Sequence, residues 1–247
     1  MKATITHKKQ TFSVNLSKPI DISIPLSDAQ NPAAWYIDKP TIVPVQSDDW
    51  IGKVSEGGDV NFNTITFNPH AHGTHTECVG HITEKVHSIN EHLTHFFYTA
   101  ELITVAPEQH GDDFVISKKQ LQYDLKGKSP EALVIRTIPN TEKKKTKNWA
   151  HTNWPYIEES AMVFLRQLGI KHLLIDLPSV DREKDEGELK AHRAFWDLDG
   201  TIRMDATITE MIYVPHRIED GSYLLNLQIA PFENDASPSK PVLYKIG

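Results

Sequence analysis

A short histidine-rich segment carries the residues of this chain that are best suited to chemistry. Residues 70–81 read His-Ala-His-Gly-Thr-His-Thr-Glu-Cys-Val-Gly-His, so four imidazoles and one carboxylate fall within twelve positions. Neutral imidazole is the commonest metal ligand in proteins, and a nearby carboxylate adds charge and can bridge two ions. The segment therefore indicates a metal site, with a structural or fortuitous histidine cluster as the alternative.

The spacing of these residues suggests how a strand would present them. His75 and Glu77 point to one face of a strand because successive side chains alternate. His81 faces the same way if the strand continues, and Gly73 permits a bulge or a close backbone approach. Three further histidines follow within the next residues, and we expect them to lie on a helix or at the surface: His87, His92 and His95.

The composition limits the classes of protein to which the chain can belong. Its 247 residues, 39% of them hydrophobic, can bury a sizeable core. A net charge of −7 argues against a general nucleic-acid binder. The single cysteine, Cys78, excludes an intramolecular disulfide and fits a reducing compartment. Residues 1–16 lack the apolar stretch of a signal peptide, and no apolar run is long enough to span a membrane, so we expect a cytoplasmic protein.

Strand-like patterns dominate the first half of the chain, and helices enter in the second half. Strands are predicted at residues 11–16, 21–24, 41–45, 61–67, 99–105, 132–138, 172–177, 207–213 and 223–229. Short helices are predicted at residues 88–93, 117–125 and 189–196. The lysine-rich segment 143–147 is expected to be a solvated loop rather than a phosphate site.

The clearest helix spans residues 156–168. Pro155 suits its start, apolar residues recur at helical spacing, and Gly169 suits its C-cap. Together with the strands at 132–138 and 172–177, this helix predicts a βαβ crossover. The chain shows no internal repeat, linker or shift in composition. We therefore expect residues 1–247 to form one α/β domain.

Several ordered segments resemble the cyclase family, which includes bacterial kynurenine formamidases and isatin hydrolases. Residues 73–81 keep the spacing of the last three ligands in that family's His-x-Gly-Thr-His-x-Asp-x-Pro-x-His motif. Ala191-His192 followed by Glu210 resembles the distal His and Glu that complete the family's metal centre. Other similar segments are Asp-Ile-Ser-Ile-Pro-Leu at 21–26, Asp-Leu-Pro-Ser-Val-Asp at 176–181 and Asp-Ala-Ser-Pro at 235–238.

The resemblance implies an α/β domain of the swivelling β/β/α type with a mixed sheet. It also implies a homodimer or homotetramer that uses one or two divalent ions, zinc first and manganese as the alternative, to hydrolyse an amide. The chain departs from the family's motif at Glu77, where the family has Asp, and at Val79, where it has Pro.

The first ligand of the motif is also displaced. Ala71 occupies its position, which leaves His70 and His72 as candidates. A one-residue β-bulge near Gly73 would return His70 to the face of His75, so we favour His70.

The chemistry that fits these residues is metal-assisted hydrolysis. A Zn²⁺ or similar ion held by His70 or His72, together with His75 and Glu77, would lower the pKa of a bound water to about 7. The resulting hydroxide attacks an amide or formamide carbonyl. The small-molecule substrate is expected to be an aromatic amide.

The three remaining candidates, His81, His192 and Glu210, have two possible roles. They either deliver a proton to the leaving nitrogen or bind a second ion. Glu210 lies among β-branched and apolar neighbours, so a buried carboxylate there needs a cation or protonated partner. We therefore expect His192 and Glu210 to converge on His81.

The same residues are compatible with other functions. A metal-activated water also opens a cyclic amide or a lactone, and the departures from the motif allow a metal-binding protein without catalysis. Aromatic residues at Trp35, Tyr36 and 149–154 suit either a substrate wall or an interface between subunits.

Overall fold

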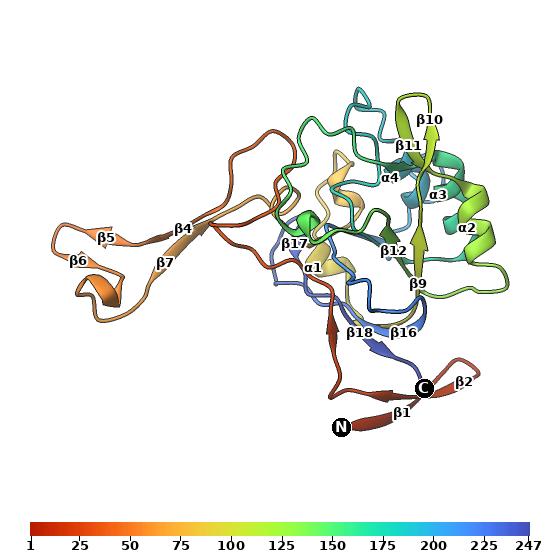
Figure 1. Cartoon of the computed structure of the whole chain (residues 1–247), viewed down its shortest axis with the longest axis horizontal. Coiled ribbons are helices and arrows are strands. Elements are labelled where there is room, and N and C mark those ends of the chain that lie inside the picture. Colours follow the sequence, from red (N-terminus) through yellow and green to blue (C-terminus); the bar gives the residue numbers. More distant parts are fainter.

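A mixed β-sheet forms the centre of the molecule in the computed structural model, which describes all 247 residues (Figure 1). Four neighbouring strands run parallel: β15 (Thr207–Glu210), β14 (His172–Ile175), β12 (Ala132–Thr137) and β9 (Phe97–Val105). Antiparallel strands extend the sheet on both sides: β8 (His75–Glu77), β17 (Ala236–Pro238), β16 (Gly221–Asn226), β18 (Val242–Lys245) and β3 (Ile20–Asp21). The order is β17-β8-β15-β14-β12-β9-β16-β18-β3. The expected α/β fold with a mixed sheet is confirmed.

Alternation along the central strands divides the core into two layers. In β12, Leu133 and Ile135 join the larger apolar cluster, whereas Ala132 and Val134 join the second. Buried residues of three helices complete the larger cluster: α2 (Lys118–Asp124), α3 (Glu159–Leu168) and α4 (Lys190–Trp196). The short helix α1 (Ile89–His92) belongs to the second layer. Because a strand shows opposite faces at successive residues, one strand contributes to both layers.

The predicted βαβ unit is present. Strands β12 and β14 are parallel neighbours, and α3 connects them. Gly169 ends α3 in the left-handed conformation, with φ of 89°, as expected for a C-cap. The helix begins later than predicted because residues 156–157 pair with a neighbouring strand, and Glu158 is extended.

Smaller elements surround the main sheet. A hairpin of β1 (Lys2–His7) and β2 (Gln10–Asn15) lies beside the C-terminus, and its first strand was not predicted from the sequence. A second sheet contains β10 (Glu108–His110), β11 (Asp113–Ile116) and β13 (Tyr156–Ile157). The chain also contains three 3₁₀ turns: η1 (Val54–Glu56), η2 (Val79–His81) and η3 (Glu142–Thr146). None of the helices has the length and apolar character needed to cross a membrane.

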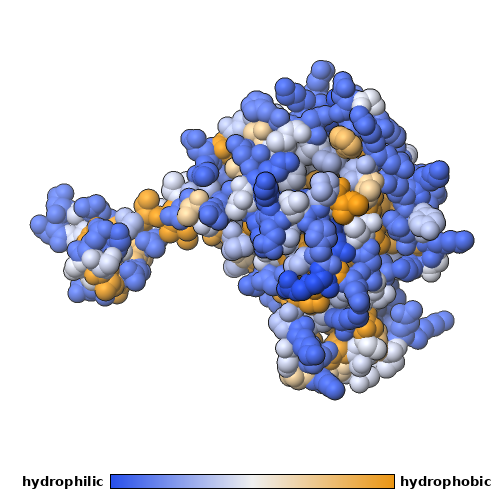
Figure 2. Space-filling view, in the orientation of Figure 1, coloured by the Kyte–Doolittle hydropathy of each residue, from blue (hydrophilic) through white to orange (hydrophobic).

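Residues 39–67 form an arm that projects from the body (Figure 1). Strands β4 (Thr41–Pro44) and β7 (Asn63–Thr66) pair along it, and β5 (Gln46–Ser47) and β6 (Trp50–Ile51) pair near its tip. The hydrogen bonds and ion pairs of residues 39–67 are all internal to the arm. Several of its apolar side chains are exposed (Figure 2), with Val43, Phe62 and Ile65 each more than half accessible.

The lysine-rich segment differs from the expected solvated loop at one position. Lys144 is buried, and its Nζ lies 2.7 Å from Asp176 Oδ2 and 2.8 Å from the carbonyl oxygen of Thr137. A charged amine is stable there because its hydrogen bonds and counter-ion replace water. The sequence prediction was wrong for Lys144, because periodicity does not reveal a distant carboxylate.

Candidate metal centre

Strand β8 places the centre of the site inside the sheet. It lies between β15 and β17, where Glu210 is the register partner of His75 and Ile208 is the partner of Glu77. The side chains of His75 and Glu77 are completely buried. Buried polar groups need partners, so both side chains require hydrogen bonds, ion pairs or a bound cation.

One nitrogen of His75 has no such partner. Its Nδ1 lies 2.9 Å from the carbonyl oxygen of Gly73, which can only accept, so Nδ1 carries the hydrogen. The other nitrogen, Nε2, is buried without a hydrogen-bond partner and lies 3.5 Å from Glu210 Oε2. A lone pair that faces a carboxylate is stable only with a proton or a cation between them. This geometry fits a metal ligand.

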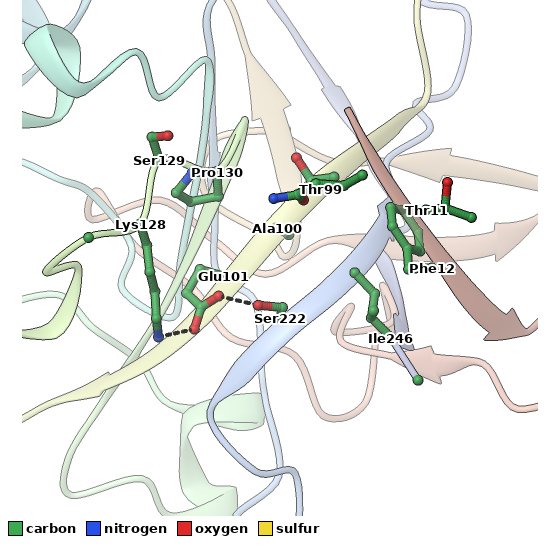
Figure 3. Close-up of a pocket in the computed structure, with 13 residues that line it drawn as sticks. Thr11, Phe12, Thr99, Ala100, Glu101, Lys128, Ser129, Pro130, Ser222 and Ile246 are labelled. Atoms are coloured by element: carbon green, nitrogen blue, oxygen red, sulfur yellow. Dashed lines mark hydrogen bonds and ion pairs between the residues drawn. The ribbon is translucent and has the colours of Figure 1, made fainter. Parts of the chain in front are cut away.

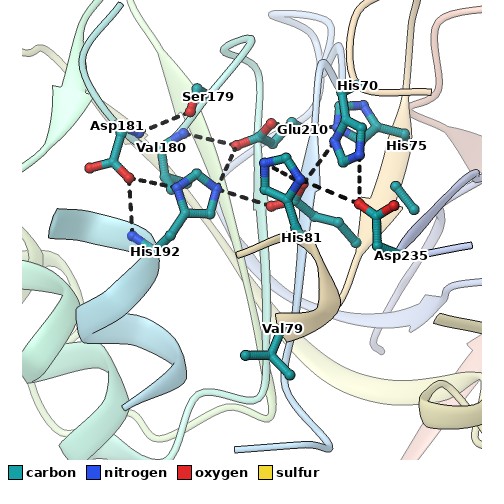
Figure 4. Close-up of polar contacts among 12 residues, drawn as sticks. His70, His75, Val79, His81, Ser179, Val180, Asp181, His192, Glu210 and Asp235 are labelled. Atoms are coloured by element: carbon teal, nitrogen blue, oxygen red, sulfur yellow. Dashed lines mark hydrogen bonds and ion pairs between the residues drawn. The ribbon is translucent and has the colours of Figure 1, made fainter. Parts of the chain in front are cut away.

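The carboxylate of Glu77 lies between two groups of imidazoles. Its Oε1 is 3.0 Å from His192 Nε2, and its Oε2 is 3.1 Å from His70 Nδ1 and 3.9 Å from His81 Nε2 (Figure 4). None of the contacts to Oε2 is a well-aligned hydrogen bond. A carboxylate with one oxygen toward each group can bridge two cations.

Helix α4 and the segment before it position His192. Asp181 accepts hydrogen bonds from the backbone amides of Ala191 and His192 at 2.7 and 3.2 Å, which fixes the start of the helix. Its Oδ2 is also 2.5 Å from His192 Nδ1. The imidazole therefore presents Nε2 to Glu77. A carboxylate behind a histidine in this way is typical of metal-binding histidines, because it fixes the tautomer and the ring orientation.

His70 has the same type of support. Its Nε2 lies 2.7 Å from Asp235 Oδ2, while its Nδ1 faces Glu77. Asp235 also contacts His81 Nδ1 at 3.3 Å, and the rings of His70 and His81 stack with centroids 4.2 Å apart. Two histidines from different elements are thus aimed at Glu77 by separate aspartates.

The electrostatics of the cluster favour positive charge. Burial acts to lower the pKa of His70, but the hydrogen bond with Asp235 and the charge of Glu77 outweigh it and raise that pKa to about 10. Burial acts to raise the pKa of Glu77, whereas the charge of His81 and the hydrogen bond from His192 hold it well below its usual range. The carboxylate of Glu77 is therefore ionised, and a cation or protons on the neighbouring imidazoles must balance its charge.

The donor set fits a divalent metal. Three overlapping groups have ligand atoms within 4.8 Å of one another: His70, His75 and Glu77; Glu77, His81 and His192; and His70, His81 and Asp235. Nitrogen and carboxylate ligands of this kind suit zinc or another first-row metal. The first two groups share Glu77, which allows either one or two ions.

The structure brings six of the seven candidate residues together and places His72 elsewhere. The cluster contains His70, His75, Glu77, His81, His192 and Glu210. His72 uses both ring nitrogens on backbone groups, with Nδ1 2.8 Å from the amide nitrogen of Asn68 and Nε2 2.7 Å from the carbonyl oxygen of Asp38.

Two local expectations were wrong. Residues 69–73 form a turn rather than a bulged strand, so His70 approaches Glu77 by chain reversal. Strand β8 ends at Glu77, and His81 lies on η2 rather than on a continued strand. The strand can end there because the amide of Cys78 bonds to the carbonyl of Asp235.

Asp181 and Asp235 also belong to the site, although the sequence pattern did not single them out as site residues. Both lie within segments that resemble the cyclase family, at 176–181 and 235–238. An aspartate in such a segment is a signal that could have been used. The sequence does not show which histidine each aspartate contacts. Asp181 is 11 residues from His192, and Asp235 is 165 residues from His70.

Neighbouring reactive groups are less suited to catalysis. The thiol of Cys78 is buried, and burial raises its pKa to about 11. A separate hollow of about 620 Å³ lies beside the N-terminal hairpin (Figure 3). Its buried carboxylate, Glu101, is already neutralised by Lys128 and hydrogen-bonded to Ser222 at 2.7 Å. This leaves the histidine cluster as the stronger candidate site.

The aromatic segments form packed structure beside the cluster. Trp154 is buried, stacks edge to face on Trp35 with centroids 5.0 Å apart, and donates its indole N–H to the carbonyl of Asp181. Tyr36 remains half exposed, and its hydroxyl donates to Glu183 at 2.9 Å. These rings support the segment that orients His192.

Comparison with known proteins identifies the class to which this fold and site belong. The Cyclase family model matches residues 20–182, and the chain belongs to the cyclase family. Kynurenine formamidase of Bacillus cytotoxicus is 28% identical over 231 residues, which cover 92% of this chain and 97% of that protein. Kynurenine formamidase of Bacillus cereus is 29% identical over 235 residues, which cover 93% and 99%.

Solved structures share the fold at lower sequence identity. Isatin hydrolase A from Labrenzia aggregata superposes with a TM-score of 0.67 at 14% identity and covers 92% of this chain and 93% of its own. A protein from Bacillus stearothermophilus, described as a predicted metal-dependent hydrolase, gives a TM-score of 0.65 at 16% identity and covers 92% and 98%.

Proposed function

We propose that this protein is a metal-dependent hydrolase that cleaves an amide bond of the arylformamide type. The observation that carries the proposal is the unpartnered Nε2 of His75, which faces Glu210 inside a cluster of histidines and carboxylates. The names of the kynurenine formamidases that resemble this chain along almost their whole length support the substrate class.

His70, His75 and Glu77 would hold one divalent cation, with Glu210 beside it. With one ion bound, His81 is left free to carry a proton; in a two-ion form, Glu77, His81 and His192 would hold the second. Zinc suits these ligands best, and manganese is the alternative. A bound divalent cation supplies Lewis acidity, which polarises a carbonyl oxygen and lowers the pKa of water.

His81 is best placed to transfer a proton to the leaving nitrogen. Its side chain is 30% exposed, whereas those of His75, His192 and Glu210 are 4% exposed or less. Asp235 contacts its Nδ1 at 3.3 Å and orients the ring. A proton carrier must reach both the substrate and water, so we assign this role to His81 and a ligand role to His192.

The test begins with protein purified without chelator. We expect bound zinc or manganese by elemental analysis, and hydrolysis of an N-formylanilide with release of formate and the amine. His75→Ala and Glu77→Ala should lose most of the metal and activity while retaining the fold, and His110→Gln, at an exposed site on β10, is the control. Full metal occupancy in both alanine variants would refute the assignment.

The same substrate panel separates the rival functions. Isatin and a simple aryl lactone test for hydrolysis of a cyclic amide or ester. Faster turnover of either would shift the proposal from formamides to cyclic substrates. Stoichiometric metal without turnover of any substrate would indicate a binding protein. In a zinc-bound structure, we expect a nitrogen of His70, rather than of His72, to lie about 2.0–2.1 Å from the ion.

We further propose that the enzyme works in the cytoplasm as a homodimer or homotetramer. The single cysteine fits a reducing compartment. The exposed apolar side chains of the arm support assembly, because a two-stranded ribbon is marginally stable alone in water. Light scattering at several protein concentrations measures the assembly, and a monomer at all of them would refute it.

A further inference from the structure

His72 lies where the projecting arm joins the metal centre. The arm comprises residues 39–67, and His72 contacts the residue just outside each end, Asp38 and Asn68. Its side chain is buried, although it belongs to neither group of proposed metal ligands.

The hydrogen bonds of His72 determine its tautomer. The backbone amide of Asn68 donates to Nδ1 at 2.8 Å, so Nδ1 carries a lone pair. The carbonyl oxygen of Asp38 lies 2.7 Å from Nε2 and can only accept, so Nε2 carries the hydrogen. A single neutral ring thus connects the two stems of the arm, and no other side chain bonds to both.

The same junction continues to the proposed ligand His70. The amide of His70 donates to Asn68 Oδ1 at 2.9 Å, and the amide of Ala71 donates to the carbonyl of Asn68 at 3.3 Å. The carbonyl of His72 accepts from Asn31 Nδ2 at 2.7 Å, which holds the turn against the body. Movement of the second stem would therefore displace the backbone that carries the His70 imidazole.

We propose that His72 is a positioning residue that fastens both stems of the arm to the turn carrying His70. The arm and this side of the metal centre then move as one unit. The part of the inference that concerns metal affinity rests on the proposed function, whereas the fastening of the stems does not. Because coupling between sites is reciprocal, metal binding should also stabilise the junction.

Two near-isosteric amides can release one stem at a time. In His72→Asn, the amide oxygen takes the place of Nδ1, so the Asn68 contact is retained and the Asp38 contact is lost. In His72→Gln, the amide nitrogen takes the place of Nε2, so the Asp38 contact is retained and the Asn68 contact is lost. His72→Leu removes both, and His110→Gln is the control.

Amide hydrogen exchange in the full-length protein is the first measurement. We expect the Asn68 amide to exchange about tenfold faster in His72→Gln but at the wild-type rate in His72→Asn. The backbone amides within residues 37–41 should instead exchange faster in His72→Asn and at the wild-type rate in His72→Gln. If His72→Leu does not fold, the two amide variants still decide the question. If His72→Asn and His72→Gln both exchange their stem amides at the rates seen in His110→Gln, the proposal is wrong.

Zinc affinity, measured by competition with a chelating dye, is the second measurement. We expect about tenfold weaker binding in His72→Gln and near wild-type binding in His72→Asn. Added zinc should slow exchange of the Asn68 amide in the wild-type protein. Complete loss of zinc in both amide variants, with unchanged exchange, would identify His72 as a ligand instead. A wild-type protein that binds no zinc would refute the proposed function, and the exchange pattern would still test the fastening of the stems.

Discussion

Changing His172 to Asn should make the stability of this protein less dependent on pH. His172 is buried at the start of β14, its ring lies against Tyr98 with centroids 3.8 Å apart, and its Nδ1 is 2.8 Å from Thr207 Oγ1. Burial lowers its pKa from 6.5 to about 3. The neutral ring is therefore part of the folded state, and protonation favours the unfolded chain.

The size of the effect follows from the two pKa values. Above pH 6.5 the ring is neutral in both states, and its contribution to stability is fully present. Between pH 6.5 and 3 only the unfolded state binds the proton, so stability falls as the pH falls. At 1.36 kcal/mol per pKa unit, the loss between pH 7.5 and pH 5.0 is about 2 kcal/mol.

This pH-dependent loss of stability can be measured by urea unfolding in the presence of a chelator. The wild type and His172→Asn are compared at pH 7.5 and pH 5.0. The Asn side chain keeps a hydrogen-bonding group near Thr207 but does not titrate. We expect the variant to be less stable at pH 7.5, because it loses the contact with Tyr98. This gap, the difference in free energy of unfolding between the wild type and the variant, should narrow by about 2 kcal/mol at pH 5.0. A gap that is the same at both pH values would refute the buried neutral state of His172.

Three further predictions concern the carboxylates. Glu210→Gln keeps a side chain of the same size but removes the charge beside the candidate centre, so zinc affinity should fall by about tenfold or more with little change in Tm, as shown by dye competition and thermal melts. Asp181→Asn removes the charged partner of His192 and should lower metal affinity or kcat by about 10–100-fold, whereas equal kinetics would contradict the support assigned to it. Lys144→Met leaves Asp176 buried without its counter-ion and should lower the free energy of unfolding by about 3–5 kcal/mol in urea titrations, and a change below 1 kcal/mol would contradict the buried ion pair.

The sequence alone determined the features that depend on local spacing. The two-residue separation of His75 and Glu77 places both on one face of any strand. The helical period before Gly169, between two apolar strands, was enough to predict the βαβ unit that the structure contains. The motif around residues 73–81 indicated the cyclase family to which the chain belongs.

Other features could be decided only by the tertiary structure. The separate roles of His70 and His72 depend on a turn and on backbone groups of Asp38 and Asn68, which no periodicity reveals. The arm also went unpredicted, because its strands have an ordinary β pattern, and that pattern does not reveal that they pair with each other outside the main sheet.

Long-range pairing explains the remaining differences. Asp235 lies 165 residues from His70, yet antiparallel pairing of β17 with β8 brings the two within hydrogen-bond distance. Lys144 was expected in solvent because its neighbours in sequence are polar, and it is buried because Asp176 lies beside it in space. Local sequence determines which residues can act as donors, and the pairing of distant strands determines which of them meet.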